Sequence, residues 1–253
     1  MDAQATGSEG SALSLVSFRP RDIRARLRIE SPSVASSWNR TLSRVMVNGT
    51  ATSLFVSQRT LRLVVGALSM ALPSVVAIWG FGLCGCFEIQ ESISHYYDLR
   101  TRDAFVGILF VIAIFMFAYQ GYEDDANDDF AGNLVCIFAL GVALFPISGA
   151  SWEQVVHVAS ALGLFSTLAY FCLVLFTKSG PTRTPKKEKR NRVYVACGWT
   201  MVVSILLAGL ASWLLDAETI AAIKPVFYLE SIAIGAFSIS WFTKGGTLWR
   251  DDP

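Results

Sequence analysis

Long apolar segments alternate with shorter polar ones through most of the chain. The hydrocarbon core of a bilayer is about 30 Å thick, so a spanning helix needs roughly 20 residues at about 1.5 Å each. The second and third apolar segments are short, and we expect their helices to extend into flanking polar residues. No alternation typical of strands appears, and an open sheet would leave backbone groups unpaired in lipid. The pattern predicts an all-α, polytopic membrane helix bundle with six transmembrane helices, at residues 61–83, 104–119, 130–147, 155–176, 193–215 and 226–243.

The apolar pattern divides the chain into three parts. Residues 1–57 are rich in Arg and Ser and contain no segment long enough to span a bilayer, residues 58–245 hold the six expected helices, and residues 246–253 form a short C-terminal tail. Two interpretations of the first part stay open. It is either a cytoplasmic tail, disordered or folded as a surface helix, whose arginines contact lipid headgroups, or a cleaved organelle transit peptide. We favour the tail, because several acidic residues interrupt the pattern of a transit peptide.

Composition and charge support a membrane protein and indicate its orientation. Apolar residues make up 53% of the chain, charged residues 16%, and the mean hydropathy is +0.47, which is more apolar than an ordinary soluble domain. Lys and Arg concentrate in the N-terminal part and in residues 178–192, which lie on one side of a six-span bundle. Because Lys and Arg mark cytoplasmic loops, we expect both termini in the cytoplasm. The lipid bilayer is the expected partner, and the segregated charge gives no reason to expect nucleic acid.

The candidate site lies at the outer side of the bundle, in and around the polar segment 88–103 between the first two spans. Two further ionisable residues fall inside the fourth and sixth spans, close to the same side. Ionisable groups inside a membrane are costly, so each is a candidate functional residue. The candidates for ligand binding or proton transfer are His95, Asp98, Arg102, Asp103, His157 and Glu230.

Two interpretations of this set stay open. Imidazole and carboxylate groups around one pocket are suited to ligand binding or proton transfer. Alternatively, Glu230 pairs with His157 or Arg102 and joins three helices structurally, since a buried carboxylate without such a partner would stay protonated.

We expect no metal and no cofactor. Cys84 and Cys86 are separated by a single residue, which is poor spacing for a disulfide, and no second Cys or His pair accompanies them as a structural zinc site requires. A catalytic zinc needs three protein ligands, and the chain has only two histidines. The acidic segment 123–129 lacks the ligand spacing of a calcium loop, so we expect a solvated turn there.

Several short motifs resemble a broad group of uncharacterised bacterial six-span membrane proteins. The resemblance covers about residues 60–245 and implies a six-helix fold and a multi-pass location in the bacterial inner membrane, but no reaction. That group is similar in layout to the damage-regulated autophagy modulator type of six-span protein. The motifs are residues 92–97, 102–107, 119–122, 139–146, 157–161 and 227–231.

A second, weaker resemblance rests on four residues, Ser94, His95, Asp103 and His157. These residues resemble those of the CREST superfamily of membrane hydrolases and receptors, which includes alkaline ceramidases, and the resemblance implies a hydrolase that uses zinc near one membrane face. The chain departs from that family in having six expected spans rather than seven, and Ala161 stands where the second histidine of an HxxxH pair would be.

These observations leave three functions open and do not decide whether the protein is an enzyme. The first is an outer-face polar pocket that binds a lipid, a small ligand or a membrane partner subunit. The second is a lipid-directed membrane hydrolase, with Asp103 or Glu230 as base and His95 and His157 as proton carriers or ligands. The third is a proton-coupled transporter, in which an aqueous path would reach Glu230.

Overall fold

The computed structural model describes residues 57–84, 88–121, 126–178 and 184–247. The predictions for the N-terminal tail up to residue 56, for Cys86, for residues 123–125 and for the last six residues therefore lie outside the described residues.

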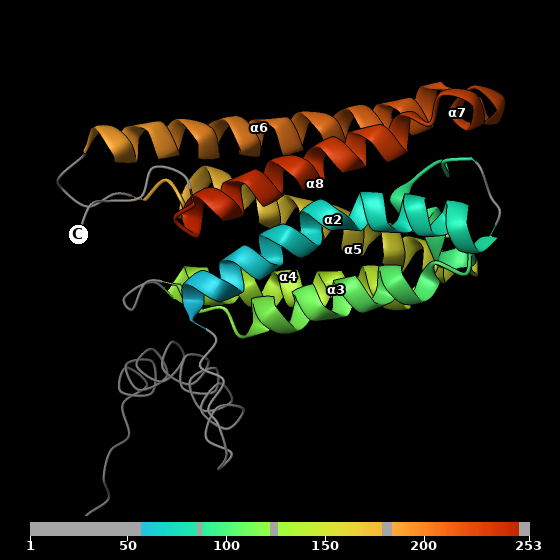
Figure 1. Cartoon of the computed structure of the whole chain (residues 1–253). Coiled ribbons are helices and arrows are strands. Elements are labelled where there is room, and N and C mark those ends of the chain that lie inside the picture. The colour runs from blue at the N-terminus through green and yellow to red at the C-terminus, as the bar shows by residue number, and fades with distance from the viewer. Residues whose placement is uncertain (1–56, 85–87, 122–125, 179–183, 248–253) are drawn as a thin grey trace, which may run out of the picture.

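The described residues form a helical bundle without strands, which confirms the all-helical prediction (Figure 1). Six long helices lie side by side along one common direction, and η2 continues α5 as a π-helical turn. The long helices are α2 (Gln58–Cys84), α3 (Arg102–Phe117), α4 (Ala126–Leu144), α5 (Ser151–Tyr170), α6 (Pro185–Leu214) and α8 (Pro225–Lys244). The short elements are η1 (Ile93–Asp98), η2 (Phe171–Leu175) and α7 (Ala217–Ile223).

Five helices are long and apolar enough to cross a membrane, as in a multi-pass integral membrane protein: α2, α4, α5 with η2, α6 and α8. The sixth, α3, has 16 residues, which corresponds to roughly 24 Å at about 1.5 Å per residue. It is therefore shorter than the hydrocarbon core, and the sixth span stays a prediction.

The start of α6 differs from the expected basic loop. Residues 185–192 are helical, so most of the basic segment lies on the first turns of α6 rather than in a connection. Thr184 caps this helix by accepting a hydrogen bond from the backbone N–H of Lys187, and Pro185 occupies the first helical position, where its missing N–H costs nothing.

Two clusters of buried apolar side chains fill the bundle. One surrounds Trp241 in the half of the bundle away from η1, where Tyr119, Phe171 and Phe176 contact the indole ring. The other lies near η1. Large apolar side chains also cover the outside of the helices, for example Trp213, which is 81% exposed. Such an outer surface suits hydrocarbon rather than water.

The segment 88–103 is not a simple polar hinge, because η1 folds back into the end of the bundle. Tyr96 and Tyr97 are buried, and the Thr101 hydroxyl donates a hydrogen bond to the carbonyl of Tyr96 at 3.0 Å. The backbone N–H of Phe227 at the start of α8 donates to the carbonyl of Glu91 at 2.9 Å. We call this the η1 end of the bundle; it also holds the α4–α5 connection and α7 (Figure 1).

The expected solvated turn at the opposite end is wrong for the part that the structure describes. Asp128 lies in the first turn of α4 with only 1% of its surface exposed. The backbone N–H of Gly121 donates to Asp129 at 3.0 Å. Gly121 lets the chain pass close to α4, because a Cβ there would collide with the side chain of Asp128.

Candidate functional site

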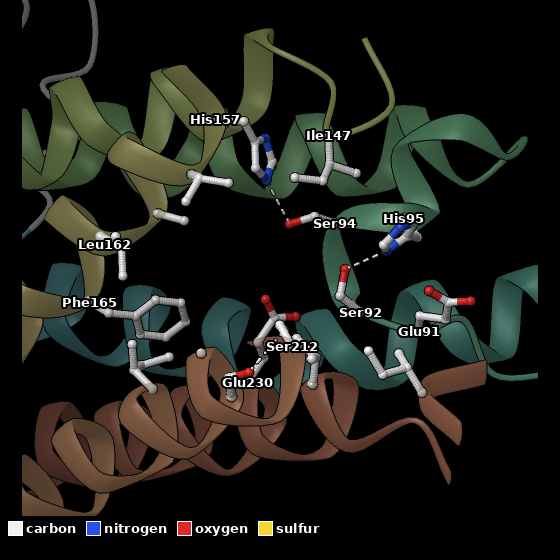
Figure 2. A pocket seen from close by; sticks show the side chains of 17 residues that line it. Glu91, Ser92, Ser94, His95, Ile147, His157, Leu162, Phe165, Ser212 and Glu230 are labelled. Carbon is white, nitrogen blue, oxygen red and sulfur yellow. Dashed lines mark hydrogen bonds between the residues drawn. The ribbon is translucent and has the colours of Figure 1, made fainter. Parts of the chain in front are cut away.

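A cavity of about 290 Å³ lies at the η1 end, enclosed by η1, α5, α6 and α8 (Figure 2). It is amphiphilic along its length. Polar residues gather near η1: Glu91, Ser92, Ser94, His95, His157 and Glu230. Apolar residues line the deeper part along α5 and α6: Ala161, Leu162, Phe165, Ile205 and Ala208. From His157 to Phe165 the lining follows nine residues of α5, a rise of roughly 12 Å over eight steps.

His157 forms the cavity wall on α5 and uses both ring nitrogens in hydrogen bonds. Nδ1 lies 2.6 Å from the carbonyl oxygen of Phe145, and Nε2 lies 2.9 Å from Oγ of Ser94. A carbonyl only accepts hydrogen bonds, so Nδ1 carries the hydrogen. In the neutral ring Nε2 is then the acceptor, and the Ser94 hydroxyl donates to it. These two bonds connect the end of α4, α5 and η1.

Glu230 enters the cavity from α8. Its Oε2 accepts a hydrogen bond of 2.8 Å from the backbone N–H of Ile93, the first residue of η1. That N–H has no partner within the helix, since the first donors of a helix are unsatisfied. Figure 2 shows the carboxylate on the α8 side of the cavity, across from Ser94 and His157.

The expected pairing of Glu230 with His157 or Arg102 is wrong. His157 is satisfied by Phe145 and Ser94, and Arg102 lies outside the cavity lining. Within the described part of the chain, no Lys or Arg lines the cavity. Among the described residues, the carboxylate therefore has one backbone hydrogen bond and no cation beside it.

His95 and Glu91 lie in the same end of the cavity. Nδ1 of His95 is 2.7 Å from Oγ of Ser92, and both residues line the cavity. Glu91 belongs to the segment that precedes η1, and its side chain is partly exposed. The polar end thus contains two carboxylates and two histidines, of which only His157 is fully buried.

Three of the six candidate residues lie elsewhere. Asp98 is exposed and accepts a hydrogen bond of 2.5 Å from the Ser148 hydroxyl. Arg102 donates to the Tyr97 hydroxyl at 2.7 Å, and its guanidinium lies 4.3 Å from the centroid of that ring. Asp103 is exposed in the first turn of α3 and does not line the cavity. It therefore cannot act as the base in this cavity.

The residue missing from the candidate set is Ser94. Its hydroxyl is a side-chain partner of His157, and 63 positions separate the two residues in the chain. The sequence pointed to Ser94 only through the weaker resemblance to membrane hydrolases, which named it together with His157. The motif at residues 92–97 marked the segment, but not its contact with α5.

The structure adds no metal centre to this picture. Within the described ranges, no group of three or more His, Cys, Asp or Glu side chains is placed to hold a metal ion.

The chain matches no family model, no curated protein and no solved structure. The resemblances to membrane-protein families therefore stay predictions.

Proposed function

We propose that the protein binds an amphiphilic molecule of the lipid class in the cavity at the η1 end. The observation that supports this is the division of the cavity into a polar end near η1 and an apolar part along α5 and α6. Several lining residues on these helices are also exposed on the outer surface, including Val158, Leu162 and Gly209. The opening therefore lies between α5 and α6, on a surface that would face hydrocarbon.

The size of the cavity fits part of such a molecule. Ligand pockets measure roughly 300–1,000 Å³, and this cavity, at about 290 Å³, is at the lower end of that range. It accommodates a polar head and the adjoining part of one chain. The remainder of the chain would extend into the bilayer through the opening between α5 and α6.

A blocking variant tests binding. A Cβ at Gly209 would meet open space, so the backbone can carry a side chain there, and Gly209→Trp places a bulky ring at the cavity opening. Gly107→Trp is the matched control, because Gly107 lies on α3 with open space around it and outside the cavity lining. After mild detergent extraction, native mass spectrometry should show bound lipid on the wild type and the control, and loss of lipid from Gly209→Trp. Equal retention by all three proteins would contradict the proposal.

We further propose six spans, with both termini in the cytoplasm of a bacterial inner membrane. The support is that the basic residues at the start of α6 and Lys244 at the end of α8 lie at the same end of the bundle, away from η1. In a variant whose five native cysteines are replaced by Ser, a membrane-impermeant maleimide should label Arg100→Cys from outside intact cells and Gln120→Cys only after the membrane is opened. Labelling of both introduced cysteines from the same side would show that α3 does not cross the membrane.

A lipid hydrolase is a second candidate, favoured by the bond between Ser94 and His157. A serine hydroxyl that donates to a neutral imidazole, whose other nitrogen is oriented by a third group, is the arrangement of an activated nucleophile. Attack on an ester would form a bond from Oγ to the carbonyl carbon while the proton passes to His157. The alcohol would leave with that proton, and water would then release the acid and restore Ser94.

A fluorophosphonate probe distinguishes this candidate from binding alone. It should label the wild type and Ser212→Ala, but not Ser94→Ala, since the Ser212 hydroxyl donates only to the carbonyl of Ala208 in its own helix. If the wild type is not labelled, the Ser94 hydroxyl serves to hold η1 against α5.

Proton-coupled transport would need an aqueous path past the packed aromatic side chains around Trp241, and it stays a prediction without a supporting observation.

A further inference from the structure

We propose that the bound amphiphile carries a primary ammonium group, and that Glu230 recognises it. This inference rests on the proposed binding function and names the chemical class of the ligand. It concerns the polar end of the cavity, where α8 and η1 meet.

The first argument is the incomplete environment of Glu230. Its carboxylate has one hydrogen bond, from Ile93, and no Lys or Arg of the described chain lines the cavity beside it. An ionisable group at this depth in a membrane helix is costly without a partner. A carboxylate also has sites for several hydrogen bonds on its two oxygens. A ligand cation that enters the cavity would supply the missing charge and the missing donors.

The second argument is the balance of donors and acceptors. The Ser94 hydroxyl hydrogen is directed at His157, so its oxygen offers the cavity lone pairs. Glu230 and Glu91 add two carboxylates to the same lining. Apart from the Ser92–His95 pair, whose donor depends on the tautomer of His95, these groups of the polar end offer acceptors, so a fitting ligand brings donors to them. A primary ammonium has three donors and no acceptor.

The third argument concerns what the cavity excludes. No Lys or Arg of the described residues lines the cavity, so an anionic head would find no cation there, whereas an ammonium would give Glu230 the partner that it needs in order to ionise. A phosphate or carboxylate at the depth of Glu230 would be left without a cation. In a zwitterionic lipid the phosphate would have to stay at the rim while the ammonium reaches Glu230.

Competition between matched lipids tests the inference. Delipidated protein receives equal amounts of dioleoyl phosphatidylethanolamine and dioleoyl phosphatidylglycerol, which share their chains, and native mass spectrometry counts the bound species. Hydrogen bonds to charged groups are strong enough to give about tenfold or greater preference for the ethanolamine lipid. Glu230→Gln should reduce the preference to within about threefold. The amide oxygen can still accept the Ile93 N–H, so the fold at this point is kept.

Two further variants make the result specific. Glu91→Gln should lower the same preference. It serves as the test if Glu230→Gln does not fold, because Glu91 bonds to α8 through its backbone carbonyl, which the substitution leaves in place. Asp103→Asn removes a charge outside the cavity and should leave the preference unchanged. Dodecylamine should displace the ethanolamine lipid, and dodecanol should not. Displacement by dodecylamine with no preference between the two phospholipids would indicate a single-chain amine as the ligand and still support an ammonium site.

The outcomes separate the inference from the function on which it rests. If both phospholipids bind equally, dodecylamine displaces neither, and Gly209→Trp abolishes binding, the lipid cavity stands and the ammonium inference is overturned. A preference that survives both Glu230→Gln and Glu91→Gln also overturns it. If the wild type retains neither lipid nor amine, both proposals fail.

Discussion

The hydrogen bond between Ser94 and His157 should measurably stabilise the η1 end, and its loss can be quantified. Ser94→Ala removes the donor and leaves Nε2 of His157 without its partner at a site where His157 is only 2% exposed. A buried polar group left unsatisfied costs about 1–3 kcal/mol. We therefore expect Ser94→Ala to lower the free energy of unfolding by about 1–2 kcal/mol.

A double-mutant cycle isolates the bond itself. His157→Leu should cost more than Ser94→Ala, because it also removes the bond to Phe145. The coupling energy between the two substitutions should be about 0.5–1.5 kcal/mol, the net value of a protein hydrogen bond. Couplings measured between helices in membranes average about 0.6 kcal/mol, so the lower half of this range is the better expectation.

Unfolding of the four proteins with sodium dodecyl sulfate in mixed micelles, followed by circular dichroism, gives the required free energies. Ser212→Ala is the matched control: it removes a hydroxyl that also lines the cavity, but one that donates within α6 at 2.9 Å. It should change stability by less than about 0.5 kcal/mol. A coupling energy within about 0.3 kcal/mol of zero would refute the assignment of this bond, as would an equal cost for the control.

Helix packing, core packing and helix capping each give one further prediction. Gly132→Ala should destabilise the bundle, because a Cβ there would press on the backbone of α3, whereas Gly107→Ala meets open space and should stabilise it by roughly 0.5–1 kcal/mol, as thermal unfolding can measure. Trp241→Ala should cost about 3–5 kcal/mol in the same assay, since the ring is fully buried. The pKa of Asp216 is lowered because it accepts hydrogen bonds from the backbone N–H and the hydroxyl of Thr219. Its stabilisation of α7 is therefore present above the unfolded-state pKa and lost as pH falls through the lower folded-state pKa, and the exchange protection of the Thr219 amide should fall with it.

The helices were predictable because a helix that crosses a membrane needs one continuous apolar run, and such a run can be recognised within a single segment of the sequence. The segment expected at 226–243 is α8, and the one expected at 61–83 lies within α2, which begins at Gln58. The helix ends were less predictable, since polar residues can extend a helix beyond the apolar run. The clearest example is α6, whose first two turns are charged and whose start is set by the cap at Thr184.

The arrangement of the site was only partly predictable because it depends on contacts between distant segments. Burial of η1 follows from its packing against α2, α3 and α8 rather than from its own composition, half of which is polar. The partnership of Ser94 and His157 likewise needs the path of the chain between two helices. Periodicity within a single segment contains no information of that kind.

Depth within a helix decided which candidate residues meet at the cavity. Asp98 and Asp103 lie at helix ends, where the side chains can reach water, and both are exposed. His157 and Glu230 lie inside spans, where partners must come from the protein or from a ligand. The described part of the chain supplies a partner for each ring nitrogen of His157, but a single hydrogen bond to Glu230. The two groups inside the helices thus differ in kind: His157 has its hydrogen bonds without a ligand, whereas Glu230 can still accept hydrogen bonds from a bound molecule.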